Sequence, residues 1–384
     1  MKAQFNHTLS DLFLDQKRLK ADPEADLVIQ KLVDKHGTPE ARRIFDTLIR
    51  EVEMPMDKLP QIIQQFVRQQ NSIPGWANPQ KIALAQQLFI DHGPKFLMFL
   101  YFKSLPLLYS MKNGVKVLVE TSRLSHDHKS GMAFSRRIAE TGQFLLEVMA
   151  PEGFKGNKPA VFAALKIRLI HAAIRHFIPT EYWNEPEWGK PINQEDLAAT
   201  LMTFSVAMTE GLKQFNLTVS KAEEDAYLHY WLIIGSLMGI DEDLLPQKAE
   251  DGLYLLDAIL SRQSAHSEEG VLLTKALTTF VSNRVESGIL KTSPHVMIRF
   301  LTGKQIAGRL GVKRKRFWWL HWLLPAFLKI WFGIGERLED RVKSFEYFSD
   351  QASKMLVRNM VKYFDSYKQR YFHLPDSLRR KWFQ

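Results

Sequence analysis

Hydrophobic residues recur along this chain with the three- and four-residue spacing of amphipathic helices. The clearest segments are "ADLVIQKLVDKHG" (25–37), "PEARRIFDTLIREVE" (39–53), "PQKIALAQQLFIDHG" (79–93) and "SKAEEDAYLHYWLIIGSLMGI" (220–240). Ser220 and Glu223 have the spacing of a capping box, and Gly37 and Gly93 are predicted to end their helices. Because alternating strand patterns are scarce, the sequence predicts an all-α protein.

The sequence shows no repeat of fixed period, so the domain organisation is inferred from the positions of turn-forming residues. Pro and Gly in "SIPGWANPQ" suggest that residues 1–78 form an N-terminal helical subregion. Residues 79–335 are then expected to form the main helical domain, and residues 336–384 to form C-terminal helices packed on the core. The segment 177–196 is rich in Pro and aromatic residues, and it is expected to be an ordered loop in which Tyr182, Trp183 and Trp188 avoid solvent.

Two apolar stretches are long enough to be tested as membrane spans. "GPKFLMFLYFKSLPLLYSM" is interrupted by Lys103 and Pro106, and "FWWLHWLLPAFLKIWFGIG" by His, Pro and Lys, so neither is a clean spanning helix. The second stretch follows the basic run "KRKR" and is rich in Trp, which is typical of a segment at a bilayer interface. Residues 313–335 are therefore expected either to contact a membrane peripherally or to form a helix packed on the body.

Composition limits which binding partners and which cellular location are expected. The net charge of +10 favours an anionic partner, but the basic residues occur in many segments, so no nucleic-acid partner is expected. The absence of Cys excludes disulfides, zinc–thiolate sites and thiolate-ligated haem. Because the N-terminus has no apolar stretch of signal-peptide length, a cytoplasmic location is expected, with peripheral membrane contact as a further option.

Polar residues interrupt the apolar stripe of the helix predicted around residues 136–148. Arg137 and Thr141 are four residues apart and share one helix face with apolar neighbours. A buried guanidinium needs an anionic partner, which is either a bound anionic ligand or an internal carboxylate such as Glu120 or Glu147.

The next predicted helix, "KPAVFAALKIRLIHAAIRHFIP", carries His171 among apolar residues and close to Arg168 and Arg175. Such a histidine is either a hydrogen-bonded core residue or a haem-iron ligand, in which case the nearby arginines would pair with the haem propionates. His126 and His128 in "SHDHKS" form a less specific candidate metal site.

The spacing of Arg137, Thr141 and His171 resembles the haem b oxygenases that include the bacterial latex-clearing proteins (rubber oxygenases) and the MpaB-like fungal oxygenase of mycophenolic acid synthesis. Their motif is Arg, three residues, Thr, and about thirty residues later the haem-ligating His. The order of further segments extends the resemblance from about residue 91 to 335. These segments are "EWGKPINQEDLAATLMTFS", "EEDAYLHYWLIIGSLMGI" and "WLLPAFLKIWFGIG".

The resemblance implies a globin-like helical core that holds haem b, with additional N- and C-terminal helices. His171 would be the proximal iron ligand, Arg137 and Thr141 would contact the cofactor, and Arg168 and Arg175 would be further cofactor-binding residues. It also implies an oxygenase that uses dioxygen on an apolar substrate, such as a lipid or an isoprenoid.

One position departs from the family. Rubber oxygenases have a Lys immediately before the motif Thr, whereas this sequence has Glu140, so the distal iron ligand and the substrate are left open. Glu120 lies near the place of the family's distal acid, and both carboxylates are candidate catalytic groups. The alternative is a non-catalytic haem- or lipid-binding protein at a membrane surface, in which His176 or His229 could be a second iron ligand.

Overall fold

The computed structural model describes residues 9–50, 56–123, 132–283, 290–313, 319, 322–330 and 378, which are helical and contain no β-sheet. The all-α prediction is confirmed. The helices are α2 (Asp11–Arg18), α3 (Pro23–His36), α4 (Thr38–Arg50), α5 (Gln61–Gln70), α6 (Pro79–Phe99), α7 (Leu105–Tyr109), α8 (Lys116–Arg123), α9 (Met132–Val148), α10 (Pro159–Phe177), α11 (Glu185–Trp188), α12 (Gln194–Phe204), α13 (Val206–Gln214), α14 (Lys221–Leu237), α15 (Ala249–Gln263), α16 (Glu268–Ser282) and α17 (Ser293–Arg309).

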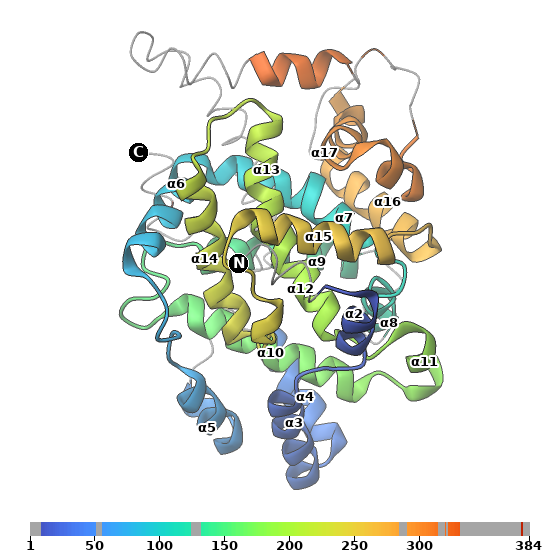
Figure 1. Ribbon diagram of the computed structural model, residues 1–384. Helices are drawn as coiled ribbons and strands as arrows, with labels where there is room; N and C mark the ends of the chain where they lie inside the picture. Colours follow the sequence, from blue (N-terminus) through green and yellow to red (C-terminus); the bar gives the residue numbers. More distant parts are fainter. Residues whose placement is uncertain are drawn as a thin grey trace.

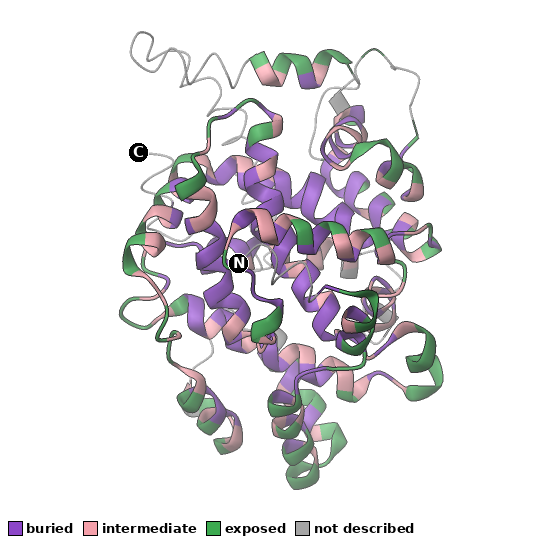
Figure 2. Cartoon of the chain, in the orientation of Figure 1, coloured by how far each residue is buried: buried purple, intermediate pink, exposed green. Residues whose placement is uncertain are grey.

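Helix α14 runs through the centre of the molecule, with α6, α10, α12, α13 and α15 around it (Figure 1). From Ala226 onward its side chains are buried on every face, which is why its apolar pattern is nearly continuous there, and the surrounding helices expose their outer faces (Figure 2). Tyr227 stacks on Phe96 of α6 at a centroid distance of 4.8 Å, and Trp231 packs on Phe204 of α12 at 5.2 Å. These aromatic pairs hold α6 and α12 against α14.

The predicted helix ends are only partly correct. Ser220 and Glu223 form the capping box at the start of α14, and Gly37, with φ +78°, ends α3. Gly93 was the wrong end for the next helix, because α6 continues through Gly93 and Pro94 to Phe99. The buried aromatic residues beyond the proline, which include Phe96, offset the hydrogen bond that Pro94 cannot donate.

The segment 177–196 is ordered, as predicted. Trp183 is buried, packs edge-on against Trp188 at 5.3 Å, and donates a hydrogen bond of 2.8 Å from Nε1 to the Gly189 carbonyl. Tyr182 is 58% exposed, so the expectation that all three aromatic side chains avoid solvent was wrong for this one.

The N-terminal helices α3 and α4 lie against α10 at one end of the molecule (Figure 1). The proposed boundary at residue 78 stays a prediction, and residues 336–384 lie outside the described residues except for Leu378. Within the described part of the chain, no helix combines the length and the apolar composition needed to cross a membrane.

Candidate functional site

A cavity of about 330 Å³ lies among α7, α8, α9, α10 and α12, beside α14. Its volume falls in the range of pockets for small molecules and cofactors, roughly 300–1,000 Å³. Most of its wall is apolar, including Phe144, Phe204 and Trp231. The polar side chains that reach it are Tyr109, Thr121, Arg137, Glu140, Thr141, His171, Asp196 and Thr200. The cavity therefore brings together four of the seven residues that the sequence singled out.

His171 reaches the cavity because α10 turns one apolar stripe toward it, with Ile167, Ile170 and Ile174 on the same wall. The part of the chain that the structure describes gives its imidazole no hydrogen-bond partner. Burial, followed by the positive charge of Arg175, lowers the pKa of His171 to about 3. The imidazole is thus neutral at physiological pH, and a neutral ring nitrogen is the form that binds a metal.

Arg137 and Thr141 lie on the facing helix α9. Arg137 donates from Nη1 to the Leu118 carbonyl at 2.6 Å and from Nη2 to the Thr121 hydroxyl, while Thr141 Oγ1 donates to the Arg137 carbonyl at 2.8 Å. Burial lowers the pKa of Arg137, and the charge of Glu140 opposes this shift. A guanidinium nevertheless stays protonated in proteins.

Among the described residues, Arg137 forms no ion pair, so the predicted internal bridge to Glu120 or Glu147 is absent. The two oxygens that accept hydrogen bonds from Arg137 are both neutral, so its guanidinium lies at the cavity wall without an ion-paired carboxylate among the described residues. An anionic group of a ligand would compensate this charge.

The two predicted carboxylates are placed differently. Glu140 lines the cavity, and its Oε1 accepts a hydrogen bond of 2.6 Å from Nε of Arg136, one helical turn earlier. Glu120 lies on α8 but is not among the cavity-lining residues, whereas its neighbour Thr121 is. The structure thus brings Glu140, rather than Glu120, to the site.

The two predicted propionate partners on α10 do not line the cavity. Arg168 holds Asp22 in a bidentate pair at 2.6 and 2.9 Å and also binds Glu24 at 2.9 Å, while Arg175 binds Asp26 at 2.7 Å. These contacts lie on the face of α10 that packs against α3. Both arginines therefore attach the N-terminal helix to the His171 helix.

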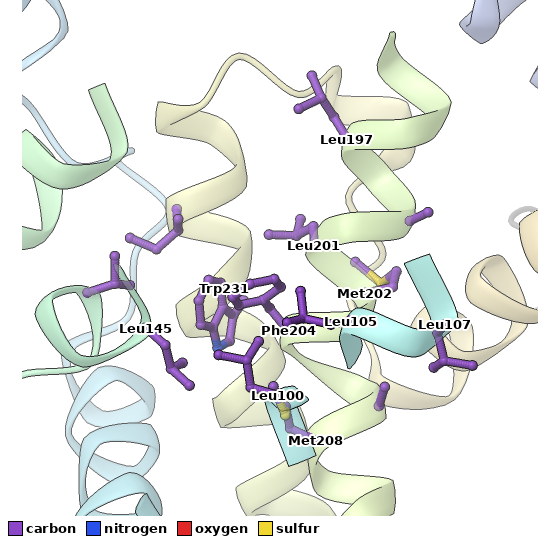
Figure 3. Close-up of a cluster of buried hydrophobic side chains, with 14 of the residues drawn as sticks. Leu100, Leu105, Leu107, Leu145, Leu197, Leu201, Met202, Phe204, Met208 and Trp231 are labelled. Carbon is purple, nitrogen blue, oxygen red and sulfur yellow. The ribbon is translucent and has the colours of Figure 1, made fainter. Parts of the chain in front are cut away.

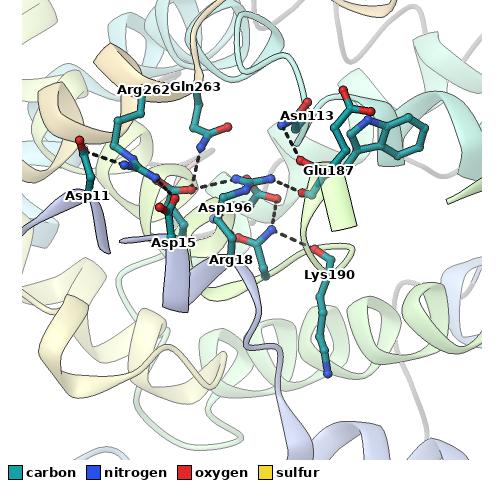
Figure 4. Close-up of polar contacts among 12 residues, drawn as sticks. Asp11, Asp15, Arg18, Asn113, Glu187, Lys190, Asp196, Arg262 and Gln263 are labelled. Carbon is teal, nitrogen blue, oxygen red and sulfur yellow. Dashed lines mark hydrogen bonds and ion pairs between the residues drawn. The ribbon is translucent and has the colours of Figure 1, made fainter. Parts of the chain in front are cut away.

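Several lining residues were not singled out by sequence reasoning, among them Thr121 and Asp196, whereas Trp231 belongs to the segment "EEDAYLHYWLIIGSLMGI" that it identified. Thr121 is on a short helix with no motif of its own, and Asp196 is in the first turn of α12. Asp196 also accepts from Arg18, whose guanidinium joins α2 to α12 together with Glu195 (Figure 4). Trp231 lies in the middle of the buried aliphatic cluster between α12 and α14 (Figure 3).

Two of the segments that extend the family resemblance have identifiable structural roles. In "EWGKPINQED", Ile192 lines the cavity and Asn193 caps α12 by accepting from Asp196 N at 3.0 Å. In "YLHYWLIIG", a Cβ on Gly235 would come within 2.6 Å of Leu201, so glycine permits the close approach of α12 and α14. The segment after Ile330 lies outside the described residues.

The structure gives little support to the other histidines considered as metal ligands. The described residues hold no group of three or more His, Asp or Glu that could bind a bare ion, and His126 and His128 lie outside them. His229 accepts a hydrogen bond of 2.9 Å from Asn78 N, and neither it nor His176 lines the cavity. An iron beside His171 would therefore need most of its ligands from a macrocycle.

Comparisons with known proteins agree on one family. The sequence model described as "ER-bound oxygenase mpaB/B'/Rubber oxygenase, catalytic domain" matches residues 97–328. A rubber oxygenase of Streptomyces sp. (strain K30) is 24% identical over 301 residues, which cover 77% of this chain and 71% of that protein. The solved structure of latex clearing protein in the closed state has a TM-score of 0.71 at 20% identity, with 90% of this chain and 91% of that chain covered.

Proposed function

Since this chain belongs to the family of the ER-bound oxygenases mpaB/B' and rubber oxygenases and is an oxygenase, we propose that it depends on haem b and that His171 is the iron ligand. The observation that carries this proposal is the neutral imidazole of His171, which has no hydrogen-bond partner among the described residues and lies on the wall of an apolar cavity.

The residues around the cavity fit a haem. His171 offers one neutral nitrogen, the aliphatic and aromatic walls suit the faces of a macrocycle, and Arg137 supplies a positive charge without a carboxylate partner. Arg137 is our candidate for binding a propionate, and Thr141 holds the backbone of the same helix turn. Arg168 and Arg175 are not needed for this role, because acidic residues of α3 already neutralise them.

A bound haem would supply the activation of dioxygen, and the protein would control what surrounds that chemistry. The apolar wall excludes water, which strengthens the charges of Arg137 and Glu140 and protects reactive species from hydrolysis. Glu140 is our candidate for holding and moving a proton at its carboxylate, since it is the proposed site's acidic side chain on α9. Arg136 fixes its orientation through the 2.6 Å hydrogen bond.

Glu140→Gln is expected to lower oxygen-dependent turnover about 100-fold, within the usual range for the loss of a general acid–base group. The amide keeps the size of the carboxylate but cannot exchange a proton, so the haem content should stay unchanged. Steady-state turnover and the haem absorbance of the same samples would measure both. Glu152→Gln, at an exposed turn, is the matched control. Turnover equal to that of the wild type would remove Glu140 from the mechanism.

The substrate is proposed to be apolar, such as an isoprenoid or another unsaturated lipid, because the cavity wall is mostly aliphatic and aromatic. Incubation of the reduced protein with a panel of oligo-isoprenoids under ¹⁸O₂, followed by mass spectrometry, would test this proposal. We expect labelled oxygen in the products of wild-type protein and none with His171→Ala. Incorporation only into hydrophilic members of a mixed panel would contradict the apolar assignment.

For the location we propose the cytoplasm, with peripheral attachment to a membrane through part of residues 313–335. An apolar substrate has low solubility in water, and an enzyme that works on it gains from lying at the membrane that dissolves it. Fractionation of cells that express the full chain would test this location.

A further inference from the structure

The positive charge of this chain is concentrated near its C-terminal third. Between Ser287 and Gly335 the sequence has nine Lys or Arg residues and no Asp or Glu, which accounts for nearly all of the net charge of +10. Basic residues occur throughout the chain, but elsewhere acidic residues balance them. A stretch of this kind attracts anionic surfaces.

The described part of this stretch folds as α17 and a helix of residues 322–330. The second helix, orange in Figure 1, contacts α17 and lies at the end of the molecule opposite α3 and α4. Its inner face packs on the body through Leu324 and Leu328, and the Lys329 ammonium lies 5.3 Å from the centre of the Phe300 ring of α17. The two elements are therefore in contact.

The outer face of residues 322–330 is apolar. Trp322, Leu323 and Ile330 are 65%, 58% and 60% exposed, and the helical repeat places them within one third of the helix circumference. The charged residue of this helix, Lys329, is seven residues from Trp322 and therefore lies about 20° from it around the helix, at the edge of the apolar face, with its ammonium over the Phe300 ring. A surface helix of a water-soluble protein normally shows the opposite arrangement, with its polar side outward.

Exposed lysines accompany this apolar face. Lys304 and Lys313 of α17 and its C-terminal end are exposed and form no ion pair with any described residue. Arg299 and Arg309 are used within the fold, where they donate to the Val312 carbonyl and to Ser264 Oγ. These two contacting helices thus expose ammonium groups that form no ion pair with any described residue as well as aliphatic and indole side chains.

We propose that this surface, formed by Lys304, Lys313, Trp322, Leu323 and Ile330, docks on the interface of a membrane that contains anionic phospholipids. Tryptophan and aliphatic side chains bury their apolar area at the boundary between head groups and acyl chains, while lysines attract the anionic head groups. A nucleic acid would match the charge but leave Leu323 and Ile330 in water. The inference rests on the proposed peripheral location and does not depend on haem.

Co-sedimentation of the full chain with vesicles tests the proposal. The vesicles are pure phosphatidylcholine or phosphatidylcholine with about one quarter phosphatidylserine, a mixture with the negative surface potential of a cytoplasmic leaflet. We expect binding to the anionic vesicles, weakened by salt, and reduced at least about tenfold in Leu323→Glu and in the Lys304→Glu/Lys313→Glu double variant. Leu12→Glu is the matched control, since Leu12 is 69% exposed on α2.

Three outcomes would overturn the proposal. They are equal binding to both kinds of vesicle in all variants, binding to an RNA or DNA duplex without binding to vesicles, and concentration-dependent self-association that Leu323→Glu abolishes. The haem absorbance of each sample is recorded in parallel. Because this absorbance reports the cavity and sedimentation reports the surface, failure of one proposal is distinguishable from failure of the other.

Discussion

His171→Ala is expected to abolish retention of haem, with the Soret absorbance of the purified protein falling to background. Alanine removes the neutral nitrogen of α10 that we propose as the iron ligand and leaves Ile167, Ile170 and Ile174 to form that wall alone. Oxygen-dependent turnover should be lost with the haem. Absorbance spectra at equal protein concentration, before and after addition of haemin, would measure the effect.

Two controls make this prediction specific. His176→Ala should keep its haem, because His176 does not line the cavity. Imidazole added to His171→Ala should restore part of the Soret absorbance, since a free imidazole can replace the missing side chain within the space that it leaves. A His171→Ala protein that holds haem with the spectrum of the wild type would show that another group binds the iron.

Arg168→Ala is expected to destabilise the protein by about 3–5 kcal/mol, the usual effect of breaking a buried ion pair by removing one partner. Asp22 would be left buried without its bidentate guanidinium, with side-chain exposures of only 5% and 4% for Arg168 and Asp22. A Cβ on Gly239 would lie within 2.8 Å of this pair, which shows how tightly the surrounding turn encloses it. Chemical denaturation followed by circular dichroism would measure the change.

The Arg168 variant also separates the two roles that this residue could have. If it binds only Asp22 and Glu24, the folded fraction of Arg168→Ala should retain haem. The control is Arg43→Ala, which breaks the exposed ion pair of Arg43 with Glu40 and should leave the free energy of unfolding nearly unchanged. Loss of haem from Arg168→Ala at undiminished stability would restore Arg168 as a cofactor-binding residue.

Sequence patterns predicted the elements that are determined by interactions between residues close in sequence. The helices follow from apolar spacing and capping residues, as at Ser220, and Arg137, Thr141 and His171 were found because their spacing resembles a family motif. The end of α6 was missed because burial of Phe96, which depends on α14, outweighs the local signals of Gly93 and Pro94.

The remaining site residues depend on contacts between distant segments. Arg168 and His171 are close in sequence, and only the packing of α3 shows that they face different surroundings. Thr121 joins the site through its contact with Arg137, and Asp196 lies against the turn at Gly114, where a Cβ would come within 2.8 Å of its carboxylate. Glu120 and Thr121 are neighbours in sequence, and the rotation of α8 decides which of them lines the wall.

We propose above all that the cavity beside His171 holds haem b. The most direct test is the absorption spectrum of the untreated full-length protein, repeated after dithionite reduction and addition of CO. We expect a Soret band, or its appearance on titration with haemin to one haem per chain, and a further shift with CO. A protein that neither purifies with haem nor binds added haemin would contradict the assignment of this cavity as a haem site.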